Sequence, residues 1–538
     1  MKRKTLALYL ALVLALCLLP SAGLAVTGFE ESSDADAAPA PALTASDGSP
    51  NLGLLSDAGA FFEDHFALRN ELVTAANTLT SALFGVSSQD SVIVGRDGWL
   101  YYADSLDDYQ GTNQLSEREV FAVARQIALM QEHCYESSAD FLFAVAPNKA
   151  SLYGEHMPAR LKAGEESSSN LRRLEAALEE QGVSYVSLME LLGSQRDQGS
   201  LEGGALYHKR DSHWTNEGAA IAADALLEAL GAEHKAYAVQ PAQTQRDFSG
   251  DLDRMLFPAA PTLEDELYYE GWPSFQYCGE VESNFDPQIS TVSEQGEGSL
   301  LMYRDSFGNA LLPFMAECYP SAHFSRSVPY QLSADIAAYG ASTVVVERAE
   351  RFIPNMARNA PIMQAVPLAE LSALEGAQAV EPFSVESIQQ GAELTTLTGE
   401  LPPEALEATS RIFVCLGGEL YYEALPQCGQ DGSQQFVITL PSGLFERYGG
   451  EVELLAGSGA PADGLDFVEL SGAQQRAYDA ACEAFQQAAA ALGPQEEPID
   501  PDAPVVEVSR EKYLDCDGSG HGTLVITYSN GTTKEERF

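Results

Sequence analysis

Short apolar runs alternate with helical patterns along residues 51–367, and this alternation constrains the fold more than any other feature of the sequence. The apolar runs are bounded by turn residues and lie at 91–94, 141–146, 183–186, 299–303 and 343–346. Stretches with helical periodicity lie between them, at 117–133, 169–181 and 216–230. Nearly continuous apolar strands separated by helices are typical of a buried, largely parallel sheet. The sequence therefore predicts an α/β domain over 51–367, with a largely parallel sheet flanked by helices.

The pattern changes after about residue 380. Short strand-like runs separated by Gly, Pro and Asp lie at 412–416, 419–422, 435–440 and 451–455. This pattern predicts a small β-sandwich-like module over 380–470. An Ala-rich helix over 471–493, an acidic proline-rich linker over 494–504 and a β-hairpin tail over 505–538 are expected to follow. The composition shift favours separate units, so a chain ending near residue 375 is expected to fold.

The first 25 residues have the pattern of a secretory signal peptide. Lys2, Arg3 and Lys4 precede an apolar run from Thr5 to Leu19, and small residues follow at the spacing of a cleavage site. The apolar run is shorter than the roughly 20 residues that a membrane span needs. Residues 26–50 are rich in Ala, Asp, Ser and Pro and predict a flexible spacer. The chain is therefore expected to be exported, to the cell envelope or the medium.

The charge balance excludes one class of partner. There are 30 basic and 79 acidic residues, a net charge of −49. A surface this negative repels phosphate backbones and anionic lipids, so no nucleic-acid partner is expected. The eight cysteines show no CxxC spacing. Pairing of Cys415 with Cys428 and free buried thiols are both compatible with the sequence.

The segment from Tyr207 to Thr215 carries the first candidate site residues. It reads YHKRDSHWT and leads into the predicted helix at 216–230, for which Thr215 is a suitable N-cap. In an extended segment, residues two apart project to the same side, so Asp211 and His213 can meet. A carboxylate can orient an imidazole that acts as a general base. The alternative is that these polar residues only cap the helix and form a turn.

The second candidate segment is the run from Ser299 to Asn309, SLLMYRDSFGN. An apolar strand passes through a small polar residue, Ser306, into a helical pattern. This context exposes a nucleophilic hydroxyl and places backbone N–H groups near a developing oxyanion. Taken alone, a serine at this position can also be an ordinary N-cap. The two segments together predict a serine nucleophile with a histidine base.

These motifs resemble the SGNH-hydrolase-like domain of the AlgJ and AlgX family of exported polysaccharide O-acetyltransferases, and above all its DHHW relatives. The resemblance covers roughly 55–365. Besides the two segments above, it rests on matching pieces at 61–69, 92–101, 146–158, 248–252 and 347–351. This chain has D-S-H-W where the family nickname has D-H-H-W, which leaves the proposed Asp and His in place. The resemblance implies an SGNH-hydrolase-like fold.

Carried over to this sequence, the resemblance implies a triad of Ser306 as nucleophile, His213 as base and Asp211 as its orienting carboxylate. The Ser306 N–H is the best candidate for the oxyanion site. Further oxyanion and cleft candidates are Asn148, Lys149, Arg304 and Tyr153. No cofactor and no metal are expected.

The implied function is transfer of an acetyl group to hydroxyls of a cell-surface or extracellular polysaccharide through an acyl-serine. A membrane-bound acyl-transfer protein is a possible partner, and the acidity of this chain argues against an anionic, alginate-like acceptor. An acetyl-glycan esterase with the same triad is the first alternative, because the two differ only in whether water or a sugar hydroxyl attacks the acyl-serine. A non-catalytic glycan-binding protein is the second. A metal hydrolase that uses His208, Asp211 and His213 is the third.

Overall fold

The structure is a computed structural model of the chain. It describes residues 51–271, 274–279, 281, 283–402, 406–429, 431–448, 452–458 and 470–493, with short pieces before residue 51 and the backbone of three strands after residue 506. The predicted signal peptide and spacer lie largely outside the described residues, and so does the predicted linker at 494–504. Within the described part, no helix combines the length and the apolar character that a membrane crossing requires.

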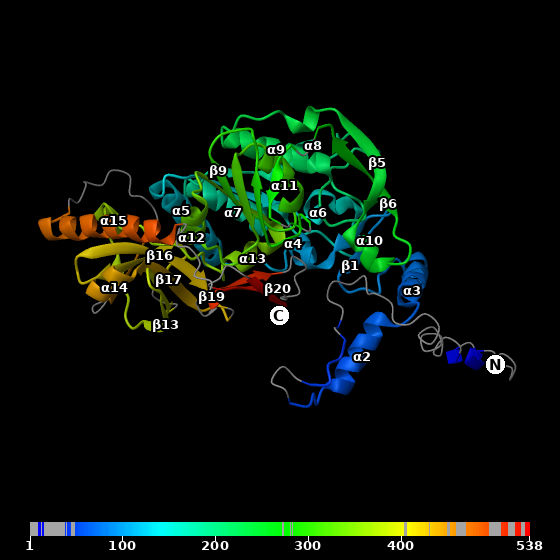
Figure 1. Cartoon of the computed structure of the whole chain (residues 1–538), viewed down its shortest axis with the longest axis horizontal. Helices are drawn as coiled ribbons and strands as arrows, with labels where there is room; N and C mark the ends of the chain where they lie inside the picture. Colours follow the sequence, from blue (N-terminus) through cyan, green and yellow to red (C-terminus); the bar gives the residue numbers. More distant parts are fainter. Residues whose placement is uncertain are drawn as a thin grey trace.

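The centre of the α/β domain is a seven-stranded sheet with the order β4-β3-β11-β9-β10-β8-β7 (Figure 1). Its first five strands run parallel: β4 (Tyr185–Val186), β3 (Asp140–Ala146), β11 (Thr343–Ala349), β9 (Ser299–Tyr303) and β10 (Ser321–Ser325). The strands β8 (Gln288–Val292) and β7 (Gln276–Cys278) complete one edge in antiparallel orientation. The predicted α/β fold with a largely parallel sheet is confirmed.

Helices cover both faces of this sheet. One face packs on α8 (Leu188–Gln195), α9 (Asn216–Ala229) and α11 (Gly308–Glu317), and the other on α5 (Glu117–Glu136), α7 (Asn170–Glu180) and α12 (Leu332–Tyr339). Along β3, Leu142 and Ala144 join the first core, whereas Phe141 and Phe143 join the second. Side chains of a strand point alternately to its two faces, so a strand buried on both sides is apolar throughout.

Two local pairings lie outside the central sheet. The predicted strand at 91–94 is β1 (Val92–Val94), which pairs with β2 (Leu100–Tyr102) across the Asp97-Gly98 turn in a sheet of its own. A second pair joins β5 (Ala242–Ser249) to β6 (Leu263–Tyr269), with α10 (Asp251–Leu256) between them. Further helices among the described residues are α2 (Leu54–His65), α3 (Arg69–Phe84), α4 (Leu106–Gln110), α6 (Lys149–Leu152), α13 (Ile353–Met356) and α14 (Ser442–Tyr448).

The β-rich module is one curled antiparallel sheet with the order β12-β18-β15-β16-β17-β14-β13. Its strands are β12 (Gln378–Ala379), β13 (Ser384–Gln390), β14 (Leu394–Leu401), β15 (Ser410–Leu416), β16 (Leu420–Cys428), β17 (Gln434–Pro441) and β18 (Val452–Ser458). The first half of β16 pairs with β15 and its second half with β17. The helix α15 (Gly472–Leu492) follows the sheet, and its Ala477 and Ala481 pack into the core of the module.

The module shares a buried core with the α/β domain. Leu425 and Val437 belong to the same apolar cluster as the sheet and α5. Arg125 of α5 forms a buried ion pair with Glu423 of β16, with 2.7 Å between Nε and Oε1. The amide of Gln126 donates to the carbonyl oxygen of Pro426 at 2.6 Å. The composition shift predicts a separately folding unit, but these contacts make the module part of the packing of the domain.

Two further expectations concern the C-terminal third. The tail has three antiparallel strands, β19 (Glu507–Leu514), β20 (Gly522–Tyr528) and β21 (Thr533–Arg537), instead of the predicted hairpin. Residues 529–532, between β20 and β21, lie outside the described residues. Cys415 and Cys428 are both buried free thiols, so the pairing considered for them is not present.

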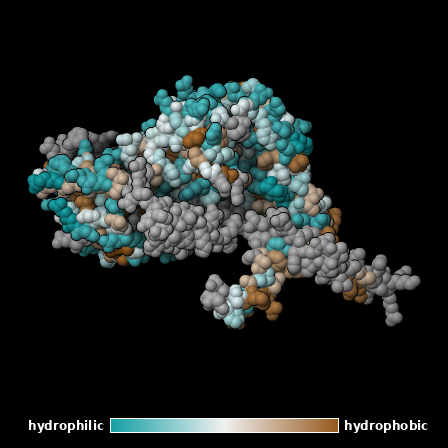
Figure 2. Space-filling model, in the orientation of Figure 1, coloured by the Kyte–Doolittle hydropathy of each residue, from teal (hydrophilic) through white to brown (hydrophobic). Residues whose placement is uncertain are grey.

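The surface in view is mostly hydrophilic (Figure 2). Hydrophobic residues gather on the segment that contains α2, which projects away from the rest of the molecule (Figures 1 and 2). Leu52 and Leu55 of this segment are almost fully exposed.

Candidate active site

Asp211 and His213 form a close pair directly before α9. Asp211 Oδ1 accepts hydrogen bonds from the backbone N–H of His213 at 2.8 Å and from its Nδ1 at 2.7 Å. Thr215 is the N-cap of α9, because its side chain accepts from the N–H of Gly218. Thr215 therefore caps the helix, and the Asp211 carboxylate binds the imidazole instead. Nδ1 carries the proton that it donates to Asp211, so Nε2 is left as the basic nitrogen.

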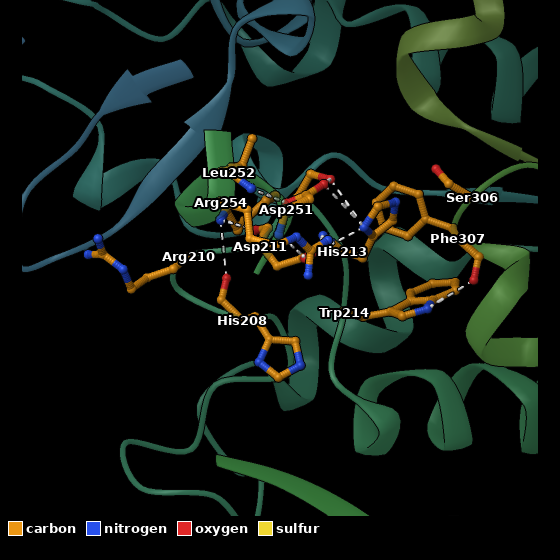
Figure 3. Close-up of polar contacts among 12 residues, drawn as sticks. His208, Arg210, Asp211, His213, Trp214, Asp251, Leu252, Arg254, Ser306 and Phe307 are labelled. Carbon is orange, nitrogen blue, oxygen red and sulfur yellow. Dashed lines mark hydrogen bonds and ion pairs between the residues drawn. The ribbon is translucent and has the colours of Figure 1, made fainter. Parts of the chain in front are cut away.

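Asp251, at the start of α10, is the second carboxylate beside this pair. Its backbone N–H donates to Asp211 Oδ2 at 2.7 Å. Its own carboxylate accepts from the N–H of Ser212 at 2.8 Å and from the Ser212 hydroxyl at 2.5 Å. Asp251 Oδ2 lies 3.7 Å from His213 Nδ1. Asp251 thus fixes the segment that carries the pair and adds negative charge beside the imidazole (Figure 3).

The charges of this cluster set its protonation states. Burial by itself raises the pKa of Asp211, but the charge and the hydrogen bond of His213 outweigh burial and hold that pKa well below its usual range. For His213, burial lowers the pKa, and the charge and hydrogen bond of Asp211 overcome this and raise it above its ordinary value. Burial and the charge of Asp211 raise the pKa of Asp251. Asp211 is therefore the ionised partner of the imidazole.

Ser306 lies in the turn between β9 and α11. The carboxylate of Asp305 shapes this turn, because Oδ1 accepts from the N–H of Phe307 at 3.0 Å and Oδ2 from the N–H of Ala349 at 2.6 Å. Glu347 Oε2 in turn accepts from the N–H of Asp305 at 3.1 Å. A Cβ at Gly308 would lie 2.5 Å from Arg304 Cβ and 2.8 Å from Glu347 Oε2, so the turn has room only for glycine there. Two buried carboxylates thus hold the backbone on both sides of Ser306.

The turn of Ser306 lies beside His213. The Phe307 ring meets the His213 ring edge-on, with 4.9 Å between centroids, and Figure 3 shows Ser306 on the same side of the imidazole. His213 Nε2 is buried and has no hydrogen-bond partner among the described residues. The hydroxyl of Ser306 accepts a hydrogen bond from Arg351 Nη2 at 3.4 Å, and no hydrogen bond joins it to His213 in the described part. Catalytic hydrogen bonds are often longer in an unliganded enzyme than in its substrate complex.

Lys149 and Tyr153, two of the predicted oxyanion and cleft residues, form hydrogen bonds elsewhere in the domain. The Lys149 ammonium donates to the carbonyls of His208 at 3.1 Å and Lys209 at 3.2 Å, and to that of Asp211, so it holds the segment that precedes the pair. Burial lowers the pKa of Lys149 to about 8. The Tyr153 hydroxyl donates to the carbonyl of Arg196 and accepts from the N–H of Leu206. Neither side chain is brought to the Ser306 hydroxyl.

Arg304 and Asn148 also form hydrogen bonds away from the Ser306 hydroxyl. Arg304 is 1% exposed and donates to Asn309 Oδ1 and to the carbonyl of Asp286. Asn148 Nδ2 donates to Asp108 Oδ2 at 2.9 Å, and its backbone N–H donates to Glu350 Oε2 at 2.8 Å. Asn148 Oδ1 has no partner among the described residues.

The histidine and carboxylate side chains around His213 do not favour a metal site. His208 is turned to Glu266, with 2.9 Å between Nε2 and Oε2, and stacks on Phe248, so it does not join Asp211 and His213. Ligand atoms of Asp211, His213 and Asp251 do lie within 4.8 Å of one another. Both carboxylates, however, accept several N–H or O–H hydrogen bonds from the protein. This arrangement suits a carboxylate that orients an imidazole.

Two residues of this cluster were not among the sequence candidates for the site. Asp251 follows Ser249-Gly250, and Arg351 follows the end of β11, so each lies in a segment that carries the family resemblance. That resemblance is the only signal in the sequence that marks them. Their contacts with Asp211 and Ser306 depend on chain crossings that no local pattern encodes.

Comparison with known proteins supports the resemblance. Residues 92–271 match the family model described as SGNH hydrolase-like domain, acetyltransferase AlgX. The probable alginate O-acetylase AlgJ of Pseudomonas putida is 22% identical over 271 residues, which cover 41% of this chain and 66% of that protein. The corresponding AlgJ of Pseudomonas syringae is 24% identical and covers 38% of this chain and 51% of that protein. The chain thus matches less than two thirds of the length of these relatives, and over the matched part the similarity to this family is confirmed.

Among solved structures, PatB1 of Bacillus cereus covers 49% of this chain and 96% of its own, with 16% sequence identity and a TM-score of 0.39.

Proposed function

We propose that the chain is an exported O-acetyltransferase that moves an acetyl group to a hydroxyl of an extracellular or cell-surface polysaccharide. The observation that carries this proposal is the Asp211–His213 pair, whose free Nε2 lies beside the turn of Ser306. The family model matched by residues 92–271 is that of an acetyltransferase domain, which favours transfer over hydrolysis.

In the first half of the reaction, His213 Nε2 takes the proton of the Ser306 hydroxyl as its oxygen attacks the acetyl carbonyl of the donor. Asp211 stabilises the imidazolium that forms, through the Nδ1–H hydrogen bond. The imidazolium then returns the proton to the leaving oxygen of the donor. This step leaves an acetyl ester on Ser306.

In the second half, His213 takes the proton of an acceptor hydroxyl, whose oxygen attacks the acetyl-serine. The new ester leaves, and His213 returns its proton to Ser306. A sugar hydroxyl as the nucleophile gives transfer, and water gives ester hydrolysis. The chemistry of the triad is the same in both cases, so occupancy of the acceptor site decides the product.

Arg351 is a cation in contact with the reacting oxygen. Its Nη2 contacts Ser306 Oγ at 3.4 Å, and its guanidinium lies over the rings of Phe307 and Phe352, with 5.6 and 4.8 Å to their centroids. A fixed cation here stabilises the negative charge that develops on the carbonyl oxygen. We assign this role to Arg351 together with the N–H of Ser306.

The acceptor is a polysaccharide, and the name of the AlgJ relatives supports this class. The net charge of −49 favours a neutral acceptor over an anionic one. Export by the N-terminal signal separates the enzyme from cytoplasmic acetyl donors, so a membrane-bound acyl-transfer protein is the proposed source of the acetyl group.

The proposal is tested with purified protein, p-nitrophenyl acetate as donor and a panel of neutral oligosaccharides as acceptors. Mass spectrometry should find an acetylated acceptor and, in a rapid quench, an acetyl group on Ser306. The Ser306→Ala variant should form neither. Release of acetate alone, unchanged by every acceptor, would favour an esterase. Failure of the wild type both to release nitrophenol and to react with a fluorophosphonate would favour a non-catalytic glycan-binding protein.

A further inference from the structure

The hydroxyl of Ser212 lies between the imidazole of His213 and the carboxylate of Asp251, and the mechanism above does not use it. Ser212 Oγ is 3.1 Å from His213 Nδ1 and 2.5 Å from Asp251 Oδ2. An ionised carboxylate can only accept hydrogen bonds, so the hydroxyl donates its one proton to Asp251. The Ser212 oxygen is therefore left as an acceptor, and the donor that faces it is the Nδ1–H of His213.

Backbone contacts hold the two segments in this arrangement. The N–H of Asp251 donates to Asp211 Oδ2 at 2.7 Å, and the N–H of Ser212 donates to Asp251 Oδ1 at 2.8 Å. Each carboxylate is thus bound by the backbone of the segment that carries the other. Gly250 permits this close approach, because a Cβ at this position would overlap the carbonyl oxygen of Arg210.

The environment makes these hydrogen bonds effective. Ser212 is 8% exposed and Asp211 is 4% exposed, so water has little access to the hydroxyl and the carboxylate. Hydrogen bonds are electrostatically stronger in such surroundings than in water. Burial and the charge of Arg351 lower the pKa of His213. The charges of Asp211 and Asp251 raise it and prevail, so both carboxylates stabilise the imidazolium.

We propose that Asp251, acting through the hydroxyl of Ser212, is a second positioning residue for His213, beside Asp211. This inference rests on the proposed function and deepens it. The relay runs from Nδ1–H to Ser212 Oγ and from the Ser212 O–H to Asp251 Oδ2, and it keeps Nδ1 protonated. Nε2 then stays free to take the proton of Ser306. The Nδ1 proton remains on the imidazole throughout the reaction.

An asparagine at position 251 would reverse the relay. Its Nδ2–H donates to Ser212 Oγ, and the serine hydroxyl proton is then free to donate to His213 Nδ1. A hydrogen bond of this direction requires Nδ1 without a proton, so it stabilises the tautomer that has its proton on Nε2. That tautomer cannot act as a base toward Ser306.

The first measurement is kcat and KM for p-nitrophenyl acetate. Asp251→Asn should lower kcat about 10²-fold, because small errors in the placement of a reacting group cost rates of this order. Ser212→Ala should lower kcat about tenfold, and Ser212→Thr should restore it, since threonine keeps the hydroxyl. KM should stay near the wild-type value, because the change affects the base and not the binding of the ester.

The second measurement does not depend on turnover. Long-range ¹H–¹⁵N spectra of the histidine-labelled full chain are recorded on the alkaline side of the His213 titration, with His213→Ala for assignment. The wild type should have its proton on Nδ1. Asp251→Asn should populate the tautomer with the proton on Nε2. Ser212→Ala should move the Nδ1–H signal to higher field, and Ser212→Thr should keep it.

Asp253→Asn is the matched control. Asp253 is a buried carboxylate on the same helix as Asp251, but its partners are Arg210, with 2.6 Å between Nε and Oδ1, and the N–H of Thr262. This variant should melt at a lower temperature and keep the wild-type kcat and spectrum.

Equal effects of Asp253→Asn and Asp251→Asn would overturn the proposal, because both carboxylates would then only support the fold. A wild-type kcat or a wild-type spectrum in Asp251→Asn would overturn it as well. A wild-type chain that fails to turn over the ester would contradict the proposed function instead, and the spectra would then decide on the relay by themselves.

Discussion

The indole N–H of Trp214 donates a hydrogen bond to the carbonyl oxygen of Phe307 at 3.2 Å. Each of these residues directly follows a member of the proposed triad, His213 and Ser306. The two rings also meet edge-on, with 5.0 Å between centroids. This contact joins the segment before α9 to the turn before α11 (Figure 3). It ties the two segments together without using the side chain of His213 or Ser306.

Replacement of the proposed nucleophile tests the triad first. Ser306→Ala should reduce turnover of a small acetyl ester by about 10⁴-fold or more, and His213→Ala by a similar factor, because the two act as a unit. Initial rates with p-nitrophenyl acetate measure the effect, with circular dichroism as the control for folding. Turnover at the wild-type level in Ser306→Ala would remove this residue from the mechanism.

Asp211→Asn separates an orienting role from a structural one. The rate should fall by up to about 10⁴-fold, because an amide favours the wrong imidazole tautomer. The base works only when His213 is neutral, so activity is lost as the pH falls through the His213 pKa. Asp211 raises that pKa, and its charge is removed in the variant, so the acidic limb of the pH–rate profile should shift to lower pH. A stable variant with the wild-type rate and profile would show that His213 has another partner.

Arg351→Lys keeps the charge and removes the planar guanidinium. The rate constant should fall by about 10²–10³-fold if Arg351 stabilises the oxyanion, with a smaller effect on KM. Arg351→Met should be at least as slow. Arg358→Lys, on the chain after α13, is the matched control and should keep the wild-type rate. A change confined to KM would instead place Arg351 in substrate binding.

The buried carboxyl group of Glu350 should make the stability of the fold depend on pH. Burial, followed by the charge of Asp108, raises the pKa of Glu350 to about 7 in the folded state. The folded chain therefore holds this proton where the unfolded chain has lost it, and stability falls as the pH rises from about 4.5 to 7. Glu350→Gln has no charge to bury, so its melting temperature relative to wild type should be higher at pH 8 than at pH 4.5. Glu297→Gln, at an exposed site, should show equal differences at both pH values.

Breaking the Arg125–Glu423 ion pair between the α/β domain and the module should cause a large loss of stability. Glu423→Ala should lower the free energy of unfolding by about 3–5 kcal/mol, because it leaves the buried Arg125 guanidinium without its main partner. Glu166→Ala breaks an exposed ion pair with Arg172 and should cost at most about 1 kcal/mol. Chemical denaturation of the three proteins measures the difference. A chain that ends at residue 375 lacks Val437, which belongs to the same apolar cluster as Val344. Loss of that part of the cluster should expose apolar residues of the α/β domain and make the chain insoluble, contrary to the composition-based expectation.

Local patterns in the sequence are sufficient to predict β3, β4, β9 and β11 of the central sheet and the contact between Asp211 and His213. The strands at 299–303 and 343–346 are apolar enough to be recognised because they are buried on both faces. Asp211 and His213 are two residues apart, so the extended backbone before α9 is sufficient to bring them together. Patterns of this kind are local, and local patterns can be recognised in a sequence.

The contacts between distant groups and the Asp211–His213 pair depend on the tertiary structure, and so does the attachment of the C-terminal third. Asp251 contacts Asp211 from 40 residues away, and Arg351 reaches Ser306 from 45 residues away. Arg125 and Glu423 are 298 residues apart, and the change in composition between their segments predicts separation where the structure has a buried ion pair. The sequence makes Lys149 a candidate for the oxyanion site, but in the folded chain its ammonium donates to backbone carbonyls of the segment 208–211. Such contacts depend on how strands and helices cross in space, and the spacing of residues along the chain does not contain that information.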